Sequence, residues 1–121
     1  MSALDDAAVA QLFGAHRYRY VNELELHDCL DEVLRAAGVV ADREVRLTAR
    51  ERIDFLLPSG LGVEVKVAGS PGAVHRQMAR YAAQPSIRAL LLVTTRPTHL
   101  QGLPAGIGGV PVLSVLLRGG I

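Results

Sequence analysis

Residues 52–66 read RIDFLLPSGLGVEVK and decide the fold. Apolar and polar residues alternate on both sides of a centre rich in proline and glycine, a pattern that predicts two β-strands joined by a tight turn. In the first strand Asp54 is the polar residue between Ile53 and Phe55. In the second strand Glu64 and Lys66 are the polar residues within a row of valines. If both apolar rows face one core and the register pairs even positions with even ones, Asp54, Glu64 and Lys66 share the other face.

Two carboxylates and a lysine on neighbouring strands have a chemical use. Converging acids repel one another and raise a pKa unless a cation lies between them. Mg²⁺ is typically held by one or two carboxylates together with water and substrate phosphate oxygens. The alternative is a solvated sheet face on which an acid–lysine pair adds a fraction of a kcal/mol.

The same residues resemble a known signature. Asp54 followed by the triplet Glu64-Val65-Lys66 is similar to the motif of the PD-(D/E)XK nuclease superfamily, with Ile53 in place of its proline, as in many members. Downstream, the stretch Gln77-Met-Ala-Arg-Tyr81 resembles the Gln-x-x-x-Tyr motif of RecB-like and lambda-exonuclease-like nucleases. Holliday-junction resolvases of this superfamily are a further branch that the chain resembles. The resemblance covers about residues 20–95.

That resemblance implies a Mg²⁺ (or Mn²⁺) ion bound by Asp54, Glu64 and the carbonyl of Val65, with an acid from the preceding helix nearby through water. The helix offers two acids. Glu25 lies three residues after Asn22, a good N-cap, and completes a capping-box pattern. Glu23 precedes the apolar stripe by three and seven residues, so we expect it to face the buried side and favour it over Glu25.

The resemblance also implies roles for three further residues. Lys66 would position the attacking water, and Gln77 and Tyr81 would line the site. Gln77 and Tyr81 are four residues apart and therefore neighbours on one helix face. His27 and Cys29 have no partner at metal-ligand spacing and receive no role.

The expected fold class is α/β, with a restriction-endonuclease-like core: a mixed β-sheet flanked by helices in the order α-β-β-β-α-β plus a final strand. Periodicity and turn residues predict these elements before any resemblance is used. The apolar run 87–95 predicts a strand covered on both faces, reached by a parallel crossover. The expected helices are 5–13, capped by the segment 2–5, then 23–37 and 73–83; the expected strands are 43–47, 52–57, 63–67, 87–95 and 112–117.

Length and composition limit the number of domains and the kinds of site that the chain can contain. Its 121 residues, half of them hydrophobic, predict a single domain over 1–121. The single cysteine, Cys29, excludes an internal disulfide and a cysteine-ligated cluster within one chain. An acidic start without a basic segment, and the lack of a long apolar run, predict a cytoplasmic protein with no membrane partner.

The formal net charge of +1 supplies no global attraction to nucleic acid. We therefore expect local contacts to DNA, and a homo-oligomer that completes the DNA groove. The expected activity is Mg²⁺-dependent hydrolysis of DNA phosphodiesters that is sequence-independent or structure-selective. The alternatives are a non-catalytic nuclease-fold module that binds nucleic acid or protein, and a subunit that needs a partner protein. The candidate nucleic-acid contacts are Arg17, Arg19, Tyr20, Arg52, Arg76 and Arg80.

Overall fold

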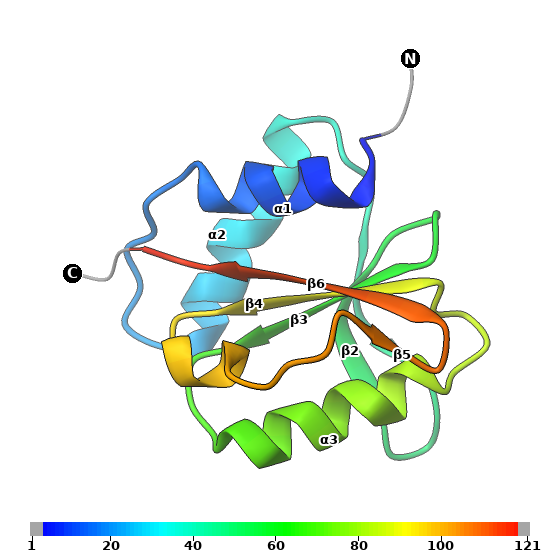
Figure 1. The fold of residues 1–121 in the computed structure, drawn as a ribbon. Helices are drawn as coiled ribbons and strands as arrows, with labels where there is room; N and C mark the ends of the chain where they lie inside the picture. Colours follow the sequence, from blue (N-terminus) through cyan, green and yellow to red (C-terminus); the bar gives the residue numbers. More distant parts are fainter. Residues whose placement is uncertain (1–3, 119–121) are drawn as a thin grey trace.

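The computed structural model describes residues 4–118 and shows a six-stranded mixed sheet with helices on both faces (Figure 1). Helices α1 and α2 cover one face, and α3 covers the other (Figure 1). The fold class is therefore mixed α/β, as predicted. The elements are α1 (Asp6–Gly14), α2 (Glu23–Ala36), β1 (Asp42–Arg46), β2 (Arg52–Leu56), β3 (Leu61–Lys66), α3 (Pro71–Ala82), β4 (Ala89–Thr94), a 3₁₀ turn η1 (Pro97–Leu100), β5 (Gly106–Ile107) and β6 (Val110–Leu116).

The strand order is β1-β2-β3-β4-β6-β5. Strands β1, β2 and β3 form the predicted antiparallel meander, and β4 runs parallel to β3 after the α3 crossover, also as predicted. All six residues of β4 are buried, as expected of a strand covered on both faces. The final strand lies parallel to β4 and begins at Val110, two residues earlier than predicted.

The helix ends follow their capping residues. The Asn22 side chain accepts the amide of Glu25 at 2.9 Å, and Glu25 accepts the amide of Val21 at 3.2 Å. The predicted capping box is therefore present in a modified form, because the second bond comes from the residue before the N-cap and not from Asn22. Asp5 caps α1 by accepting the amide of Ala8. The part of the predicted α1 cap at Ser2 lies outside the described residues. Helix α3 begins two residues before the prediction, because Ser70 is its N-cap and Pro71 its first residue.

Two apolar cores lie on opposite faces of the sheet. The first packs α1 and α2 against the odd-numbered positions of β3 and β4, including Val63, Val65 and Leu91. The second packs α3 against the even-numbered positions of β4, Leu90 and Leu92. Glu64 and Lys66 alternate with the valines of β3, so the pleat directs their side chains to the α3 face.

The second strand does not keep its alternation. Phe55 packs in the first core but Ile53, two residues away, packs in the second, so the prediction that they share a face is wrong. The change of face falls at Asp54. On β1, Glu44 lies opposite Asp54, between the pairs Arg43↔Phe55 and Val45↔Ile53, and has φ of +50°. This left-handed residue interrupts the regular pleat of β1 beside the change of face.

Gly62 provides the space for this change of face. A Cβ at Gly62 would lie 2.5 Å from Cδ1 of Ile53 and 2.8 Å from Cδ1 of Ile87. Because both distances are shorter than carbon–carbon contact allows, a side chain at residue 62 would force the ends of Ile53 and Ile87 to shift. None of the helices among residues 4–118 is long and apolar enough to cross a membrane.

We predict that Gly62→Ala lowers the free energy of unfolding by about 1–3 kcal/mol, since it overpacks the second core. Urea denaturation measures the change. Gly106→Ala is the matched control, because a Cβ there meets only Val110 O at 3.6 Å. A Gly62→Ala protein as stable as the parent would show that the side chains of the second core can rearrange to hold the added methyl group.

Candidate active site

Asp54 lies where β2 separates from β3. The ladder between these strands pairs Phe55 with Val63 and Leu56 with Gly62, which is the predicted even-with-even register. One step further, the Oδ2 atom of Asp54 accepts the amide of Val65 at 2.8 Å. A side chain thus takes the place of a backbone acceptor, and this hydrogen bond fixes the carboxylate against β3.

Glu64 and Lys66 lie next to each other on β3. Lys66 Nζ is 3.0 Å from Glu64 Oε2, and the Glu64 side chain is only 4% exposed. The other carboxyl oxygen, Oε1, is buried and has no hydrogen-bond partner among the described residues. The interpretation of this pair as a solvated sheet face is therefore wrong for Glu64, which is a buried acid with half of its carboxyl unpaired.

Burial, together with the nearby charge of Asp54 and against the opposing effect of Lys66, raises the pKa of Glu64 to about 8. Glu64 therefore holds a proton at neutral pH when no other cation is present. Asp54 Oδ2 accepts the amide of Val65, the residue next to Glu64, so the two carboxyl groups lie near each other; a shared metal site stays a prediction. A perturbed acid beside a second acid is a common property of functional sites.

Helix α2 contributes His27, which received no role from the sequence. His27 Nε2 lies 3.6 Å from Asp54 Oδ2, too far for a hydrogen bond, and is buried without a partner among the described residues. The available signal was periodicity, because His27 precedes the buried Leu30 by three residues and Leu34 by seven. A histidine on the apolar stripe of a helix is brought to the sheet by the same packing as its neighbours.

Glu23, the favoured helix acid, is exposed, so the prediction that it faces the buried side is wrong. Leu24 beside it is 64% exposed, which shows that the first turn of α2 extends past the layer that covers the helix. Spacing identifies a helix face but not how far the neighbouring layer reaches. Glu25, the second candidate, is engaged in the capping box. A water-mediated role for Glu23 stays a prediction, as does the role of the Val65 carbonyl.

Gln77 and Tyr81 form a hydrogen-bonded pair on α3. Gln77 Nε2 donates to the Tyr81 hydroxyl at 2.8 Å, and that hydroxyl donates to the carbonyl of Arg52 at 2.9 Å. Burial raises the pKa of Tyr81, and the charges of Glu64 and then Asp54 raise it further. Tyr81 therefore lies beside the acidic pair and anchors α3 to β2 just before Asp54. The structure confirms that Gln77 and Tyr81 are neighbours on α3, and their role in lining an active site stays a prediction.

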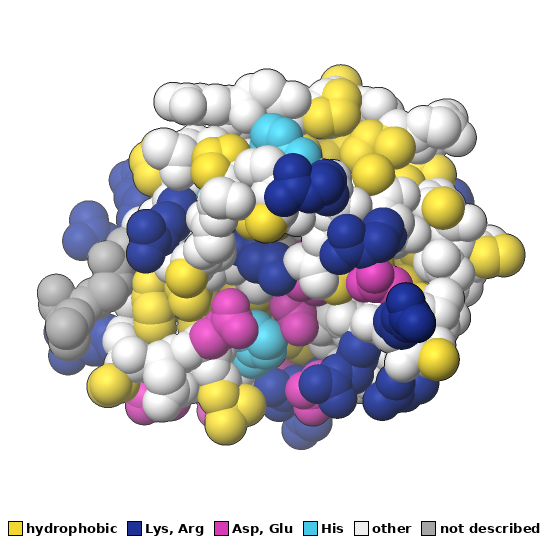
Figure 2. All heavy atoms as spheres, turned by 90° about the horizontal axis from the view of Figure 1, so that it is seen from below, with side chains coloured by type: hydrophobic (Ala, Val, Ile, Leu, Met, Phe, Trp, Pro, Cys, Tyr) yellow, Lys and Arg dark blue, Asp and Glu magenta, His cyan; other side chains and the backbone are white. Residues whose placement is uncertain are grey.

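Basic side chains surround the acidic middle of this face. Figure 2 shows acidic side chains and a histidine gathered together, with Lys and Arg side chains on either side of them. The predicted nucleic-acid contacts Arg17, Arg19, Arg52, Arg76 and Arg80 are all exposed. Tyr20 is half-buried and packs against the first core, so a base-stacking role for it stays a prediction.

Comparison of the chain with known protein families, with curated proteins and with solved structures finds no match. The chemistry of the site is therefore argued from its own residues.

Residues 4–118 contain no group of three or more histidine, cysteine or acidic side chains arranged to hold a metal ion. Mg²⁺ needs only one or two carboxylates, with water and substrate oxygens completing its shell. Asp54 and Glu64 supply that number, and the unpaired Oε1 of Glu64 is an oxygen ligand without another partner. The donor set fits a hard divalent cation.

The raised pKa of Glu64 predicts how stability depends on pH. An unfolded chain loses this proton near the ordinary value of 4.5, whereas the folded protein keeps it up to about 8. Between these values the folded state holds one proton more, so the free energy of unfolding falls as pH rises, by at most about 1.4 kcal/mol per pH unit. We predict that Glu64→Gln removes this fall and is more stable than the parent at pH 8.

Chemical denaturation in metal-free buffer from pH 5 to pH 9 measures the effect. Glu32→Gln is the control, because Glu32 is an exposed acid on α2 and its loss should leave the slope unchanged. A parent protein whose stability is flat over this range would contradict the buried, protonated state of Glu64.

Proposed function

We propose that the protein is a Mg²⁺- or Mn²⁺-dependent DNA nuclease with a restriction-endonuclease-like core. The observation that carries the proposal is the buried, half-paired Glu64 between Asp54 and Lys66, at the point where β2 and β3 separate. A carboxyl kept in such a place raises the free energy of the folded chain unless a cation binds there. The sheet order and the Gln77–Tyr81 pair also agree with the resemblance on which this function was predicted.

Asp54 and Glu64 would hold the metal, which when bound acts as a Lewis acid on the phosphoryl oxygen and lowers the pKa of a coordinated water. The hydrogen bond from the Val65 amide holds Asp54 in place and leaves its Oδ1 atom for a ligand. His27 Nε2, on the other side of Asp54, can hold the same carboxylate or contribute a nitrogen ligand.

Lys66 is bound to Glu64 in the metal-free protein. If the oxygens of Glu64 bound a cation, Oε2 would no longer be available to Lys66, and Lys66 could turn to a water or a phosphate oxygen. A lysine in that position orients the nucleophile or stabilises charge that develops on the phosphoryl group. Gln77 and Tyr81 keep α3 at a fixed position beside the reacting group.

We predict that Lys66→Ala loses DNA cleavage by a factor of about 10²–10⁴, the range expected when a positioned polar catalyst is removed. Metal binding and DNA binding should remain. The assay incubates the protein with Mn²⁺ and linear, nicked, branched and single-stranded DNA. Arg35→Ala is the control, since Arg35 pairs only with Asp31 on the exposed side of α2. Equal cleavage by the Lys66→Ala protein and the parent would overturn the proposed role of Lys66.

Metal binding provides a second test that does not depend on turnover. At pH 7, Mn²⁺ should release about one proton on binding, because Glu64 must ionise to become a ligand. Calorimetry in two buffers of different ionisation enthalpy measures the proton count. Asp54→Ala and Glu64→Gln should each abolish binding. Heats that are identical for the parent and Asp54→Ala would instead favour a non-catalytic module.

A further inference from the structure

The two edges of the sheet differ in charge. At one edge, β1 reads DREVR, with a charged residue at four of its five positions, and Glu44 with φ of +50° interrupts its pleat. Charged side chains and an irregular backbone keep other strands from pairing with an edge. At the other edge, residues 112–117 read VLSVLL and carry no charge. The β6 edge therefore lacks the protection that the β1 edge has.

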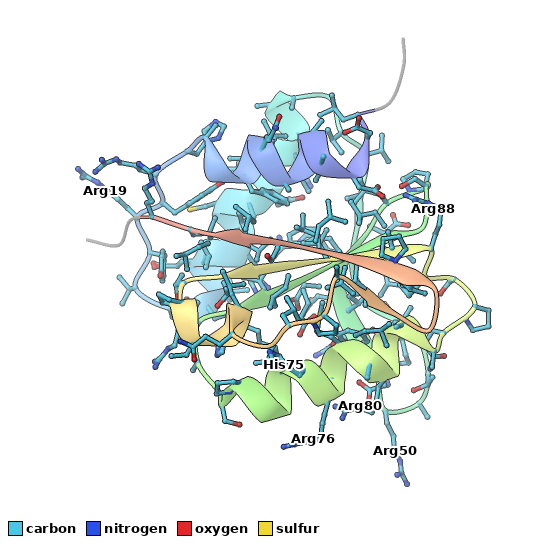
Figure 3. The ribbon with its side chains drawn as sticks, viewed as in Figure 1. Arg19, Arg50, His75, Arg76, Arg80 and Arg88 are labelled. Atoms are coloured by element: carbon cyan, nitrogen blue, oxygen red, sulfur yellow. The ribbon has the colours of Figure 1, made fainter. Side chains whose placement is uncertain are left out.

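The second half of β6 has no strand on its outer side among residues 4–118. Strand β5 pairs only with Val110 and Pro111. Figure 1 shows β6 along the front of the molecule with β5 beside its beginning, and the arginines labelled in Figure 3 lie away from its middle. Ser114 and Leu116 are exposed. An added strand would meet this half of β6 without displacing β5.

The hydrogen bonds already present determine which backbone groups face outward. The amide of Leu117 donates to a carbonyl of β4 at 2.8 Å, and the amide of Val112 donates to the carbonyl before β5 at 2.9 Å. Because backbone groups alternate in direction along a strand, the amides and carbonyls of Ser114 and Leu116 point away from β4. These four groups have no backbone partner among the described residues.

A groove lies between α1 and this edge. It is lined by Ala10, Gln11, Gly14, Ala15, Ser114 and Val115. Val115 packs against the first core, so its side chain is on the α1 face of the sheet. Three of the lining residues are alanine or glycine, and the groove therefore has room for a side chain that an added strand directs to this face.

We propose that β6 pairs in the antiparallel direction with β6 of a second copy of this chain, about a twofold axis at Val115. In this register Ser114 lies opposite Leu116 of the second copy, and the outward groups of both copies form four main-chain hydrogen bonds. Val115 lies opposite its own copy beside the groove, and Leu113 lies opposite Leu117. The inference does not depend on the proposed nuclease function.

The composition of the edge favours a second copy as the occupant. A strand that carried charges would place them over apolar side chains, whereas β6 is itself an uncharged apolar strand. The formal net charge of +1 adds little repulsion between two copies. An isologous contact of this kind also closes, so that two copies complete it and no open edge of β6 is left for a third.

The pairing joins two sheets into one. An axis perpendicular to the sheet keeps the α3 faces of both copies on the same side. Five strand spacings of about 4.8 Å separate β3 from its copy, so the two positions of Glu64 lie roughly 24 Å apart on one face.

Disulfide cross-linking tests the register in the full chain carrying Cys29→Ser. Residues opposite each other at a non-hydrogen-bonded position, as Val115 and its copy are, have Cα atoms about 4.5 Å apart, which a disulfide can bridge. Val115→Cys should form a covalent dimer under mild oxidation. Leu113→Cys is the matched control and should form none, because Leu113 and its copy are about 13 Å apart along the strands.

Sedimentation measures the dimer without a cross-link. The parent should change from 12.9 kDa to twice that mass as its concentration rises from about 1 μM to about 1 mM. Ser114→Pro should weaken the dimer by at least about tenfold, because it removes one outward amide from each copy and leaves the bonds to β4. Ser114→Ala keeps the amide and is the matched control.

Leu116→Lys tests the same edge through a side chain alone and should also weaken the dimer. Its control is Val40→Lys, because Val40 is 70% exposed on the connection to β1, beside the opposite edge. Circular dichroism verifies that each variant is folded, and if Ser114→Pro is not, the two lysine variants decide. A parent that stays monomeric would overturn the inference. Equal dimerisation by a variant and its control, or cross-linking of Leu113→Cys as well as Val115→Cys, would also overturn it.

Discussion

The hydrogen bond from the Val65 amide to the Asp54 carboxylate joins the architecture of the sheet to its chemistry. Strands β2 and β3 pair closely near their turn and then separate, and at that point a side-chain oxygen replaces the backbone acceptor. Without the separation, Asp54 would be one more alternating residue of a flat hairpin. With it, the carboxylate is held beside Glu64 by the backbone of the neighbouring strand.

Two buried polar atoms without hydrogen-bond partners among residues 4–118 lie at this same point. Glu64 lies in the middle of a strand whose other positions, apart from the half-buried Lys66, are buried and apolar or glycine. Only one of its two carboxyl oxygens has a partner among the described residues. His27 Nε2 is likewise buried without a partner on the other side of Asp54. Two unsatisfied polar atoms within one small region are unusual in a folded chain, where more than about 90% of buried polar groups are paired. Their concentration at the separated strands, and not in either core, is what distinguishes a candidate site from a packing defect.

The elements of the fold could be predicted from the sequence to a large extent. Alternation identified the meander, and a continuous apolar run identified β4, because each pattern follows directly from which faces are covered. The even-with-even register was the stated condition for Asp54 and Glu64 to share a face, and the structure shows it, although the other premise, that Ile53 and Phe55 share a face, is wrong. The short strand β5 and the turn η1 were missed, since a two-residue strand and a single 3₁₀ turn have no periodicity to detect.

What could not be predicted depends on contacts between distant segments. The change of face between Ile53 and Phe55 occurs beside a left-handed residue on β1 and beside Gly62, and neither feature is visible in the sequence of β2 itself. Glu23 and His27 are one turn apart on α2, yet only His27 is covered. That difference depends on where the neighbouring layer ends.

The passage of Ile53 over Gly62 has a consequence for how variants of this protein are interpreted. The side chain that fills the second core is attached to the residue directly before Asp54, so interior volume and the placement of the carboxylate cannot vary independently. A substitution of Ile53 or Gly62 would therefore be expected to move the Asp54 carboxylate as well as to disturb the second core, although neither residue has a polar side-chain atom. In this chain, residues without polar side chains help to determine where the Asp54 carboxylate lies.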